Sequence, residues 1–527
     1  MKTSLHACLA LLIYVLTNID KEVSCAQTRY VVDNMVKSEI KLRYSGFIVF
    51  ASKLLSVATG IAFVLMITRT VSKEEFGIWG NISDVFSYFI LLATVLPFWT
   101  TRFVAREHTG SARTGLVANI FISIASASIY LALLPIILSA LQIGTAYTIL
   151  YTILSIQILE LYTIYSLESV LLAKQPQTIG YGLLVYEVCK VTLGFTLIIQ
   201  LKLGLLGAIY SMISSYVIQI VFYIKLTAEE LKESVRWTYL KEWLKASPIN
   251  LYNIVGNNIA TFTLIFLFIY GELARSYYGA AATIASVVAY STFLAYALYP
   301  RLLSESNTKD VSTSLKMVLM FAIPMTTGAM VLSDSYLTIL GLVYRDATPV
   351  LLLLAINALC SSLSEVFNTV VMGTEGLDAK AKIPFRELTK SRIFQIFTLP
   401  YIQSAVTLPT TFFALFYIAK TQLEAATYLA LISLIVGIAM LVCRYIIARK
   451  CLTFNFPWKN VAKYIVASAV MVAPLLIISH PTRLLLTVGL TVLGGIIYFA
   501  ILATIDQETR ELTKSVLNEV KSKLRIT

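Results

Sequence analysis

The sequence predicts an all-α polytopic membrane protein with about 14 transmembrane helices. Of its 527 residues, 58% are hydrophobic and only 13% are charged, which is about half the charged fraction of a soluble protein. Apolar runs of about 20 residues recur along the chain, the length that a helix needs to cross the hydrocarbon of a bilayer. The net charge of +13 does not indicate a nucleic-acid partner, because the basic residues are spread over many connections and form no single patch.

Fourteen candidate spans can be delimited, and most connections between them are short. No connection is long enough to form a separate folded domain. The spans are 44–68, 78–99, 114–141, 146–171, 178–201, 204–226, 248–270, 274–300, 315–333, 348–371, 393–418, 423–447, 459–479 and 482–503.

Lysine and arginine alternate sharply between successive connections. Every second connection is rich in them. The poor set holds only Arg69, Lys73, Lys202, Arg275, Arg345, Lys420 and Arg483. Because basic loops stay in the cytoplasm, both termini are expected there, and the protein is expected to be a multi-pass protein of the plasma membrane.

Span counting predicts two six-helix lobes and two accessory helices. Residues 227–247 separate the lobes and are rich in Lys and Glu, with Trp and Leu on one face. This pattern predicts an interfacial amphipathic helix. The expected parts are an N-terminal segment 1–43, an N-lobe 44–226 with spans 1–6, a cytoplasmic linker 227–247, a C-lobe 248–447 with spans 7–12, accessory spans 13–14 at 459–503, and a cytoplasmic C-terminal helix 504–527. Residues 1–34 are either an over-extended start or peripheral helix, or an extra membrane segment, since Met35 opens a more natural N-terminus.

Polar side chains follow the helical period inside three spans. On span 10 they are Asn357, Ser361, Ser364 and Asn368. Lys53 and Ser56 lie three apart on a small, polar face of span 1, and Asn250, Asn253 and Asn257 form a stripe on span 7. Polar groups within a membrane usually face a cavity or a partner, which indicates a wet cavity between the lobes. Two alternatives remain open, because Lys53 could snorkel toward the headgroups and the asparagines could bond neighbouring helices.

Four carboxylates inside predicted spans are candidates for coupling transport to an ion. They are Asp84, Glu160, Glu187 and Glu365. Burial favours the neutral form of a carboxyl group, which suits proton exchange, although Glu187 could instead form a local ion pair with Lys190. The six cysteines and three histidines show no ligand spacing, so we expect no metal site, no cofactor and no structural disulfide.

Several short stretches resemble one family. These are "VSKEEFGIWG" (71–80), "LYPRLLSE" (298–305), "SYLTILGLVYRDATPVL" (335–351), "VVMGTEGLDAK" (370–380) and "IDQETRELTKSVL" (505–517). In residue pattern and in order along the chain they resemble the polysaccharide-biosynthesis, or oligosaccharide, flippases of the multidrug/oligosaccharidyl-lipid/polysaccharide exporter superfamily, particularly archaeal members.

The resemblance implies a V-shaped, two-lobe transporter that works by alternating access. It would move a polyprenyl- or dolichyl-(pyro)phosphate-linked glycan from the cytoplasmic to the outer leaflet among the membrane lipids, with H⁺ or Na⁺ as a possible coupling ion. Basic cavity residues engage the phosphate in such proteins, and Lys53 and Arg275 approximate the family's basic positions in spans 1 and 8.

Two other classes of function are compatible with a polytopic membrane protein. A multidrug or cation exporter of the same superfamily would favour carboxylates over cations in its cavity. A membrane glycosyltransferase or ligase would need long outer loops with acidic metal ligands, and the longest outer loop here, "SDSYLTILGLVYRDA" (333–347), carries only Asp334 and Asp346. We therefore expect no enzyme activity and no catalytic residue.

Overall fold

The computed structural model describes residues 34–140, 143–305, 307–379, 383, 385–478, 481–507 and 509–510. All the regular elements in this part of the chain are helices, as the sequence predicts. Thirteen of them are long and apolar enough to cross a membrane. The predicted N-terminal segment up to residue 33 and the C-terminal helix beyond residue 510 lie outside the described residues.

Contacts along the chain define two compact units. Unit 1 comprises Met1–Ala93 and Asn119–Glu229, and unit 2 comprises Thr94–Ala118 and Glu230–Thr527. Residues 94–118, which span counting assigns to the N-lobe, thus belong by their contacts to unit 2. The lobe boundaries themselves stay a prediction.

Unit 1 is built from long helices that correspond to the early predicted spans. They are α2 (Asn34–Thr68), α3 (Lys73–Phe89), α5 (Ser111–Ala140) from Asn119 onward, α6 (Thr148–Lys174), α7 (Gln177–Gly194) and α8 (Gly204–Leu226), with short turns η1 (Leu91–Thr94), η2 (Thr145–Tyr147) and η3 (Phe195–Gln200).

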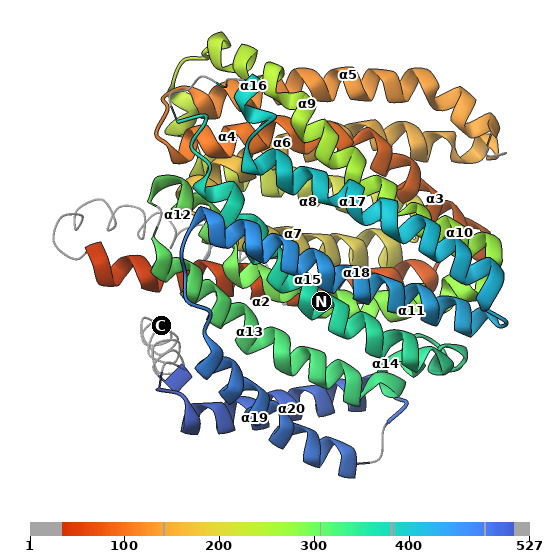
Figure 1. Ribbon diagram of the computed structural model, residues 1–527. Coiled ribbons are helices and arrows are strands. Elements are labelled where there is room, and N and C mark those ends of the chain that lie inside the picture. The colour runs from red at the N-terminus through yellow and green to blue at the C-terminus, as the bar shows by residue number, and fades with distance from the viewer. Residues whose placement is uncertain are drawn as a thin grey trace, which may run out of the picture. The chain divides into compact units, whose positions relative to one another are not determined.

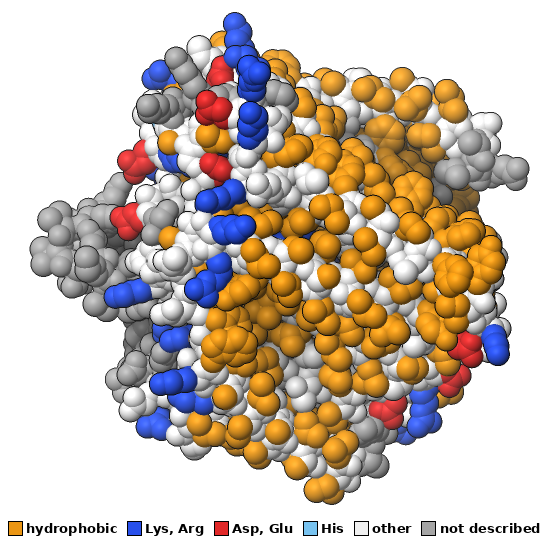
Figure 2. All heavy atoms as spheres, in the orientation of Figure 1, with side chains coloured by type: hydrophobic (Ala, Val, Ile, Leu, Met, Phe, Trp, Pro, Cys, Tyr) orange, Lys and Arg blue, Asp and Glu red, His pale blue; other side chains and the backbone are white. Residues whose placement is uncertain are grey.

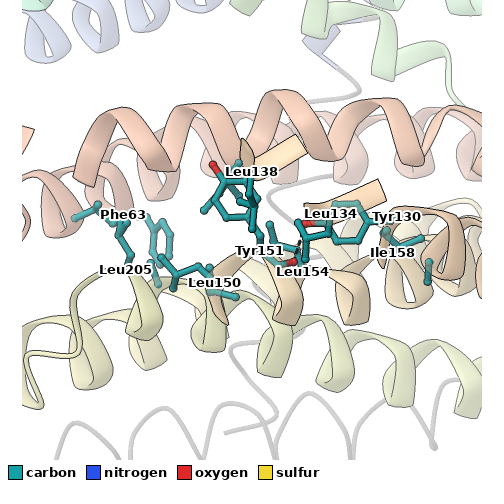
Figure 3. Packing of buried hydrophobic residues seen from close by; sticks show 14 of the residues in the cluster. Phe63, Tyr130, Leu134, Leu138, Leu150, Tyr151, Leu154, Ile158 and Leu205 are labelled. Atoms are coloured by element: carbon teal, nitrogen blue, oxygen red, sulfur yellow. Dashed lines mark hydrogen bonds between the residues drawn. The ribbon is translucent and has the colours of Figure 1, made fainter. Parts of the chain in front are cut away.

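The core of unit 1 is packed from aromatic and branched side chains of α2, α5, α6 and α8. Figure 3 shows Tyr130 of α5 lying against Tyr151 and Leu154 of α6. The Tyr130 hydroxyl donates a hydrogen bond to the Tyr151 carbonyl at 2.7 Å, as a buried tyrosine hydroxyl requires. This rigid packing fixes the rotation of α6, and with it the direction of its polar side chains.

Unit 2 holds the remaining helices. They are α4 (Val95–Ala105), α9 (Trp237–Ala260), α10 (Phe262–Tyr270), α11 (Glu272–Ala289), α12 (Leu298–Ser304), α13 (Thr308–Val331), α14 (Ser333–Leu340), α15 (Thr348–Thr374), α16 (Phe385–Leu388), α17 (Arg392–Phe413), α18 (Gln422–Cys451), α19 (Trp458–Ile477) and α20 (Leu484–Ile505), with turns η4 (Glu230–Lys232), η5 (Tyr290–Ala295), η6 (Leu342–Ala347) and η7 (Ala414–Ile418).

The outer face of α18 shows why this unit belongs in a bilayer. Leu431, Ile435, Ile438, Val442 and Ile446 recur every three or four residues and are all exposed. Over α17 and α18 the surface in Figure 2 is mostly apolar, with few charged side chains. An apolar face this large would be unusual on a soluble monomer, and lipid is its natural solvent.

The two accessory helices form a pair on one side of unit 2. In Figure 1, α19 and α20 lie next to each other along α13. Their shared core includes Tyr464, Met471 and Tyr498, and the Tyr498 hydroxyl donates to the Met320 carbonyl of α13 at 2.8 Å. The predicted spans 459–479 and 482–503 therefore match these helices within two residues.

The second predicted span, 78–99, is not a continuous helix. It is divided into α3, the 3₁₀ turn η1 and α4. The apolar part Leu91–Ala105 is then too short to count as a span, so 13 rather than 14 long apolar helices are found among the described residues. Pro97 is the third residue of α4. Proline lacks the N–H that would continue a preceding helix but is tolerated in the first turn of a new one, so the chain restarts there.

Span 8 repeats this break. Helix α11 ends in the 3₁₀ turn η5, and α12 follows with Pro300 again as its third residue. Spans 5 and 11 share a second irregularity, because α7 runs into the π-helical η3 and α17 into the π-helical η7. The N–H of Leu201 and that of Ala419 each bond the carbonyl five residues earlier, at 2.9 Å. Two pairs of spans six apart in the chain, 2 with 8 and 5 with 11, therefore share their departures from regular helix.

The expected interfacial helix at 227–247 differs from the structure. Only its second half is helical, and it continues as α9 through Pro248 into span 7. Trp237 is exposed, but Trp243 is fully buried, with its ring centroid 5.3 Å from that of Phe103. Tertiary packing on α4, rather than a lipid surface, holds this tryptophan.

Candidate functional site

Unit 1 carries a group of ionisable residues within its membrane helices, here called the charged cluster. It comprises Lys53 of α2, Glu160 and Glu168 of α6, and Glu187 and Lys190 of α7. Both glutamates at 160 and 187 are about 95% buried. Ionisable groups at such depth are costly and usually functional.

Glu187 and Lys190 form the local ion pair that their spacing allows. The Lys190 Nζ lies 2.6 Å from Glu187 Oε2 and 4.9 Å from the centroid of the Tyr186 ring. Thr59 of α2 donates a hydrogen bond to the same carboxylate oxygen at 2.5 Å. The pair therefore joins α7 to α2, and the carboxylate is satisfied within the protein.

Lys53 of α2 lies within electrostatic reach of Glu168 of α6. Its side chain is half-buried. The Glu168 carboxylate is 3.1 Å from the Tyr223 hydroxyl, to which Gln219 donates at 3.0 Å. Lys53 thus has a nearby group of opposite charge, and part of the Lys53 side chain is still accessible. Ser56, one turn further on, is also half-buried and donates to the Lys53 carbonyl at 2.7 Å.

Glu160 differs from the other carboxylates of the cluster. It is 5% exposed, and neither of its carboxyl oxygens has a hydrogen-bond partner among the described residues. Glu160 interacts electrostatically with the hydroxyls of Tyr186 and Tyr216, whose rings stack with centroids 4.4 Å apart. An ionised carboxylate without partners costs several kcal/mol to bury, so this group is suited to carry a proton.

Unit 2 contains a polar pocket of about 290 Å³ between α9, α10, α11, α15, α17 and α18. Its wall includes Asn357 and Ser364 of α15, Gln403 of α17 and Arg444 of α18. The Arg444 Nη1 donates to Ser364 Oγ at 2.9 Å. Glu365 lies within electrostatic reach of Arg444 and accepts hydrogen bonds from Asn368.

The asparagine stripe of α9 is divided between two roles. Asn250 is buried and donates to the Val95 carbonyl of α4 at 3.1 Å, which is a helix-to-helix bond. Asn253 is half-buried and Asn257 is exposed, and the Asn257 amide donates to Asn253 Oδ1 at 3.2 Å. Asn258 beside them is exposed too. Exposed amides in the middle of a membrane helix indicate contact with water rather than lipid.

Arg275 and Asp84 are the remaining predicted residues. Arg275 lies in the first turn of α11, half-buried and within electrostatic reach of Tyr278. Asp84 falls in α3, but its side chain is outside the described residues. Among the residues described, no group of three or more His, Cys, Asp and Glu could hold a metal ion.

A buried arginine cluster joins α4 to the turn that follows α15, within unit 2. Arg102 is fully buried. Its Nε and Nη2 donate to the two carboxylate oxygens of Asp378 at 2.8 and 2.6 Å, and its Nη1 donates to the Met372 carbonyl at 2.7 Å. Arg106 pairs with the same carboxylate and donates to the Glu375 carbonyl at 2.6 Å.

These arginines determine the acidity of Asp378. Burial alone would raise the pKa of its carboxyl group, but the charges and hydrogen bonds of Arg102 and Arg106 outweigh burial, so the pKa lies below its usual value. Asp506, beyond α20, is similar. Its pKa is also lowered, because its hydrogen bonds from Lys463 and Thr509, both at 2.8 Å, outweigh its burial.

The lowered pKa of Asp378 predicts how stability depends on pH. Its contribution is complete above the ordinary carboxyl pKa of about 3.9 and is lost as the pH falls through the lower folded value. We expect the difference in thermal midpoint between wild type and Asp378→Asn to be constant from pH 8 to about pH 4 and to shrink below that. Intrinsic fluorescence of detergent-solubilised protein measures this, and a difference that persists unchanged at pH 3 contradicts the assignment.

Sequence reasoning missed the cationic residues at both unit 2 sites. Arg102 lies three residues beyond the predicted span 78–99, and Arg444 lies in the last turn of the predicted span 423–447. A charged residue at the end of a hydrophobic run is assigned by default to the membrane surface. In the structure α18 continues to Cys451, which leaves Arg444 inside the helix and on the pocket wall. The hydroxyl and amide residues of α15, Asn357, Ser361 and Ser364, recur at helical spacing and were the available signal.

Comparison with known proteins places the fold. No protein-family model matches the chain, and no curated protein does. Solved structures match over most of their length. An outward-facing multidrug resistance MATE family transporter of the MOP superfamily is 13% identical with a TM-score of 0.63, covering 78% of this chain and 96% of that one.

A second match is a MOP superfamily transporter from Pyrococcus furiosus, whose binding pocket is described as having reverse polarity. It is 13% identical with a TM-score of 0.64, covering 79% of this chain and 97% of that one. MATE in its bent conformation is 14% identical with a TM-score of 0.60, covering 82% and 97%. At these identities the likeness shows the fold alone. The chain is a multi-pass membrane protein with a two-lobed, MATE-like transporter fold.

Proposed function

We propose that this protein is a transporter that moves a lipid-linked oligosaccharide from the cytoplasmic to the outer leaflet by alternating access, coupled to an ion. The observation that carries the proposal is the kind of side chain left accessible at membrane depth. In unit 1 it is a lysine, half-buried beside hydroxyl groups, and in unit 2 it is a row of amides on α9. Both are chemistries that bind oxygen-rich, anionic ligands.

The three parts of a lipid-linked sugar need three environments. Its phosphate needs a cation, and the Lys53 side chain supplies one. Its glycan hydroxyls need groups that both donate and accept hydrogen bonds, as Asn253 and Asn257 do. Its polyprenyl tail can stay in lipid. No covalent bond is made or broken, so no catalytic residue is required.

Proton exchange at Glu160 would couple this movement to a gradient. The carboxyl group is buried without a hydrogen-bond partner among the described residues, so its charged and neutral forms differ greatly in energy. A helix rearrangement that admits water would let Glu160 release its proton. Glu160 would have to bind a proton again before it is reburied. Protonation is then linked to conformation, which is what ion-coupled alternating access requires.

A multidrug or cation exporter is the second candidate. Glu160 favours it as well, because a buried carboxylate can attract an organic cation. The accessible charge in unit 1 argues against it, since the half-buried Lys53 would repel such a substrate. Plasma-membrane location with cytoplasmic termini is common to both proposals.

Deletion of the gene in its host, followed by analysis of lipid-linked glycans, separates these functions. A flippase predicts accumulation of fully assembled glycan that faces the cytoplasm. Intermediates that lack one sugar would instead indicate a glycosyltransferase. Normal glycans together with raised sensitivity to cationic dyes would indicate the exporter.

Replacing Lys53 should weaken transport without unfolding the protein. We expect Lys53→Gln to lower the rate of flipping in proteoliposomes roughly tenfold, because a charge-assisted hydrogen bond is worth about 1.5–3 kcal/mol. Lys53→Arg should keep most of the rate, since it keeps the charge. The exposed Lys225 at the end of α8 gives the matched control, and Lys225→Gln should behave as wild type. Equal rates for the two glutamine variants would remove Lys53 from the site.

A further inference from the structure

The polar pocket of unit 2 has a size that limits what it can hold. Its volume of about 290 Å³ is at the lower end of the roughly 300–1,000 Å³ found for small-molecule sites. Most of its lining side chains carry a hydroxyl, amide or guanidinium group. Drug-sized ligands bind in larger and mostly apolar pockets, so the occupant here is small and polar.

Two atoms at the pocket wall lack hydrogen bonds. The Arg444 Nε is a donor and the Asn357 Oδ1 is an acceptor, and both are shut off from solvent without a partner among the described residues. Unsatisfied buried polar atoms are uncommon and call for an explanation. A rotation of both side chains toward the pocket would let one ligand satisfy both atoms.

The position of Asn357 depends on a close approach between α15 and α18. A Cβ at Gly437 would lie only 2.3 Å from Asn357 Oδ1, so only glycine leaves room for this amide. Gly437 therefore maintains the pocket because it has no side chain that would displace Asn357.

The donors and acceptors together select one ligand class. A cation would be repelled by Arg444, the charged residue of the wall. A phosphate has acceptors for Arg444 but, when fully ionised, no proton for Asn357 Oδ1, and the nearby Glu365 carboxylate opposes it. A sugar ring offers oxygens to the guanidinium and hydroxyl protons to the amide oxygen.

We propose that this pocket binds one pyranose ring, hydrogen-bonded by Arg444, Asn357 and Ser364, as a subsite for the glycan of the transported lipid. The inference rests on the proposed function and adds to it the part of the substrate that unit 2 recognises. The sugar subsite is separate from Lys53, which lies in unit 1.

Saturation-transfer difference NMR on the purified full chain tests the subsite, because it detects weak binding. The probes are methyl α-D-glucopyranoside, methyl α-D-mannopyranoside and N-acetyl-D-glucosamine, with inorganic phosphate and tetraphenylphosphonium tested as competitors. At least one pyranoside should give a saturable signal that neither competitor removes. Gly437→Ala, which displaces Asn357, and Ser361→Leu, which fills the pocket, should each reduce it at least fivefold.

Gly489→Ala is the matched control, because a Cβ at Gly489 of α20 meets nothing within 4 Å, and it should bind as wild type. Loss of binding counts only in variants whose thermal midpoint stays near wild type, and two variants at different positions guard against misfolding. Absence of a saturable signal for every pyranoside, equal signals in all variants, or displacement by tetraphenylphosphonium would overturn the subsite. If the host deletion leaves lipid-linked glycans normal while the pocket variants lose sugar binding, the proposed function fails and the subsite stands.

Discussion

Replacing Asp378 with alanine is expected to destabilise the protein by about 3–5 kcal/mol. This is the typical effect of removing one partner of a buried ion pair and leaving the other charge uncompensated. Arg102 has no exposed surface, and two of its three nitrogens would lose their carboxylate acceptor. Arg106 would lose its partner as well.

The measurement is thermal unfolding of the detergent-solubilised protein at pH 7, compared with a control on an exposed pair. Asp334 and Arg345 are 4.0 Å apart, with side chains 27% and 67% exposed, so Asp334→Asn should change stability by less than about 1 kcal/mol. The double variant Arg102→Met/Asp378→Leu should recover part of the loss, because it removes the charges of Arg102 and Asp378 and leaves only Arg106 without its partner. Equal midpoints for Asp378→Ala and Asp334→Asn would contradict the assignment of Asp378 as the counter-ion.

Replacing Glu160 with glutamine is expected to abolish the gradient-dependent part of transport and to leave stability unchanged or slightly raised. Glutamine has the shape of the protonated carboxyl but cannot release a proton. Glu160 has no hydrogen-bond partner among the described residues to lose. Flipping in proteoliposomes with and without an imposed pH gradient, together with the thermal midpoint, gives both readouts.

The neighbouring carboxylates provide controls with opposite behaviour. Glu187→Gln should destabilise, because it leaves the buried Lys190 without its partner at 2.6 Å. Glu168→Gln should alter the charge balance around Lys53 but keep a response to the gradient. If Glu160→Gln still responds fully to the gradient, then proton exchange takes place elsewhere, and a lower midpoint for this variant would show that the carboxylate is ionised in the folded protein.

The sequence predicted the helical class, most spans and the accessory pair because hydropathy reports on each helix separately. The Glu187–Lys190 pair was also predictable, since side chains three apart on a helix always meet. The break in span 2 was not, because about 20 apolar residues give the same hydropathy whether or not Pro97 interrupts them. Contacts between distant residues, such as Lys53 with Glu168 or Arg102 with Asp378, depend on how helices pack, and no periodicity reveals them.

The same limit explains why neither Arg102 nor Arg444 is among the predicted site residues. A charged residue near the end of a hydrophobic run is assigned to a loop by default, since an unpaired charge in lipid is costly. Arg102 is stabilised by the Asp378 carboxylate and the Met372 carbonyl, and Arg444 by the Ser364 hydroxyl. These partners are distant from the arginines in the chain. The candidate site could therefore be predicted in unit 1, where the charges stand clearly inside the spans, but only in part in unit 2.

The matching irregularities of spans 2 and 8 and of spans 5 and 11 bear on the ancestry of the chain. Two unrelated six-helix stretches would have no reason to interrupt the same two helices. In one helix of each half the interruption is a 3₁₀ turn before a helix with proline at its third residue, and in the other it is a π-helical turn. Duplication of an ancestral gene accounts for both. A common backbone pattern therefore links the two halves at spans 2 and 8 and at spans 5 and 11.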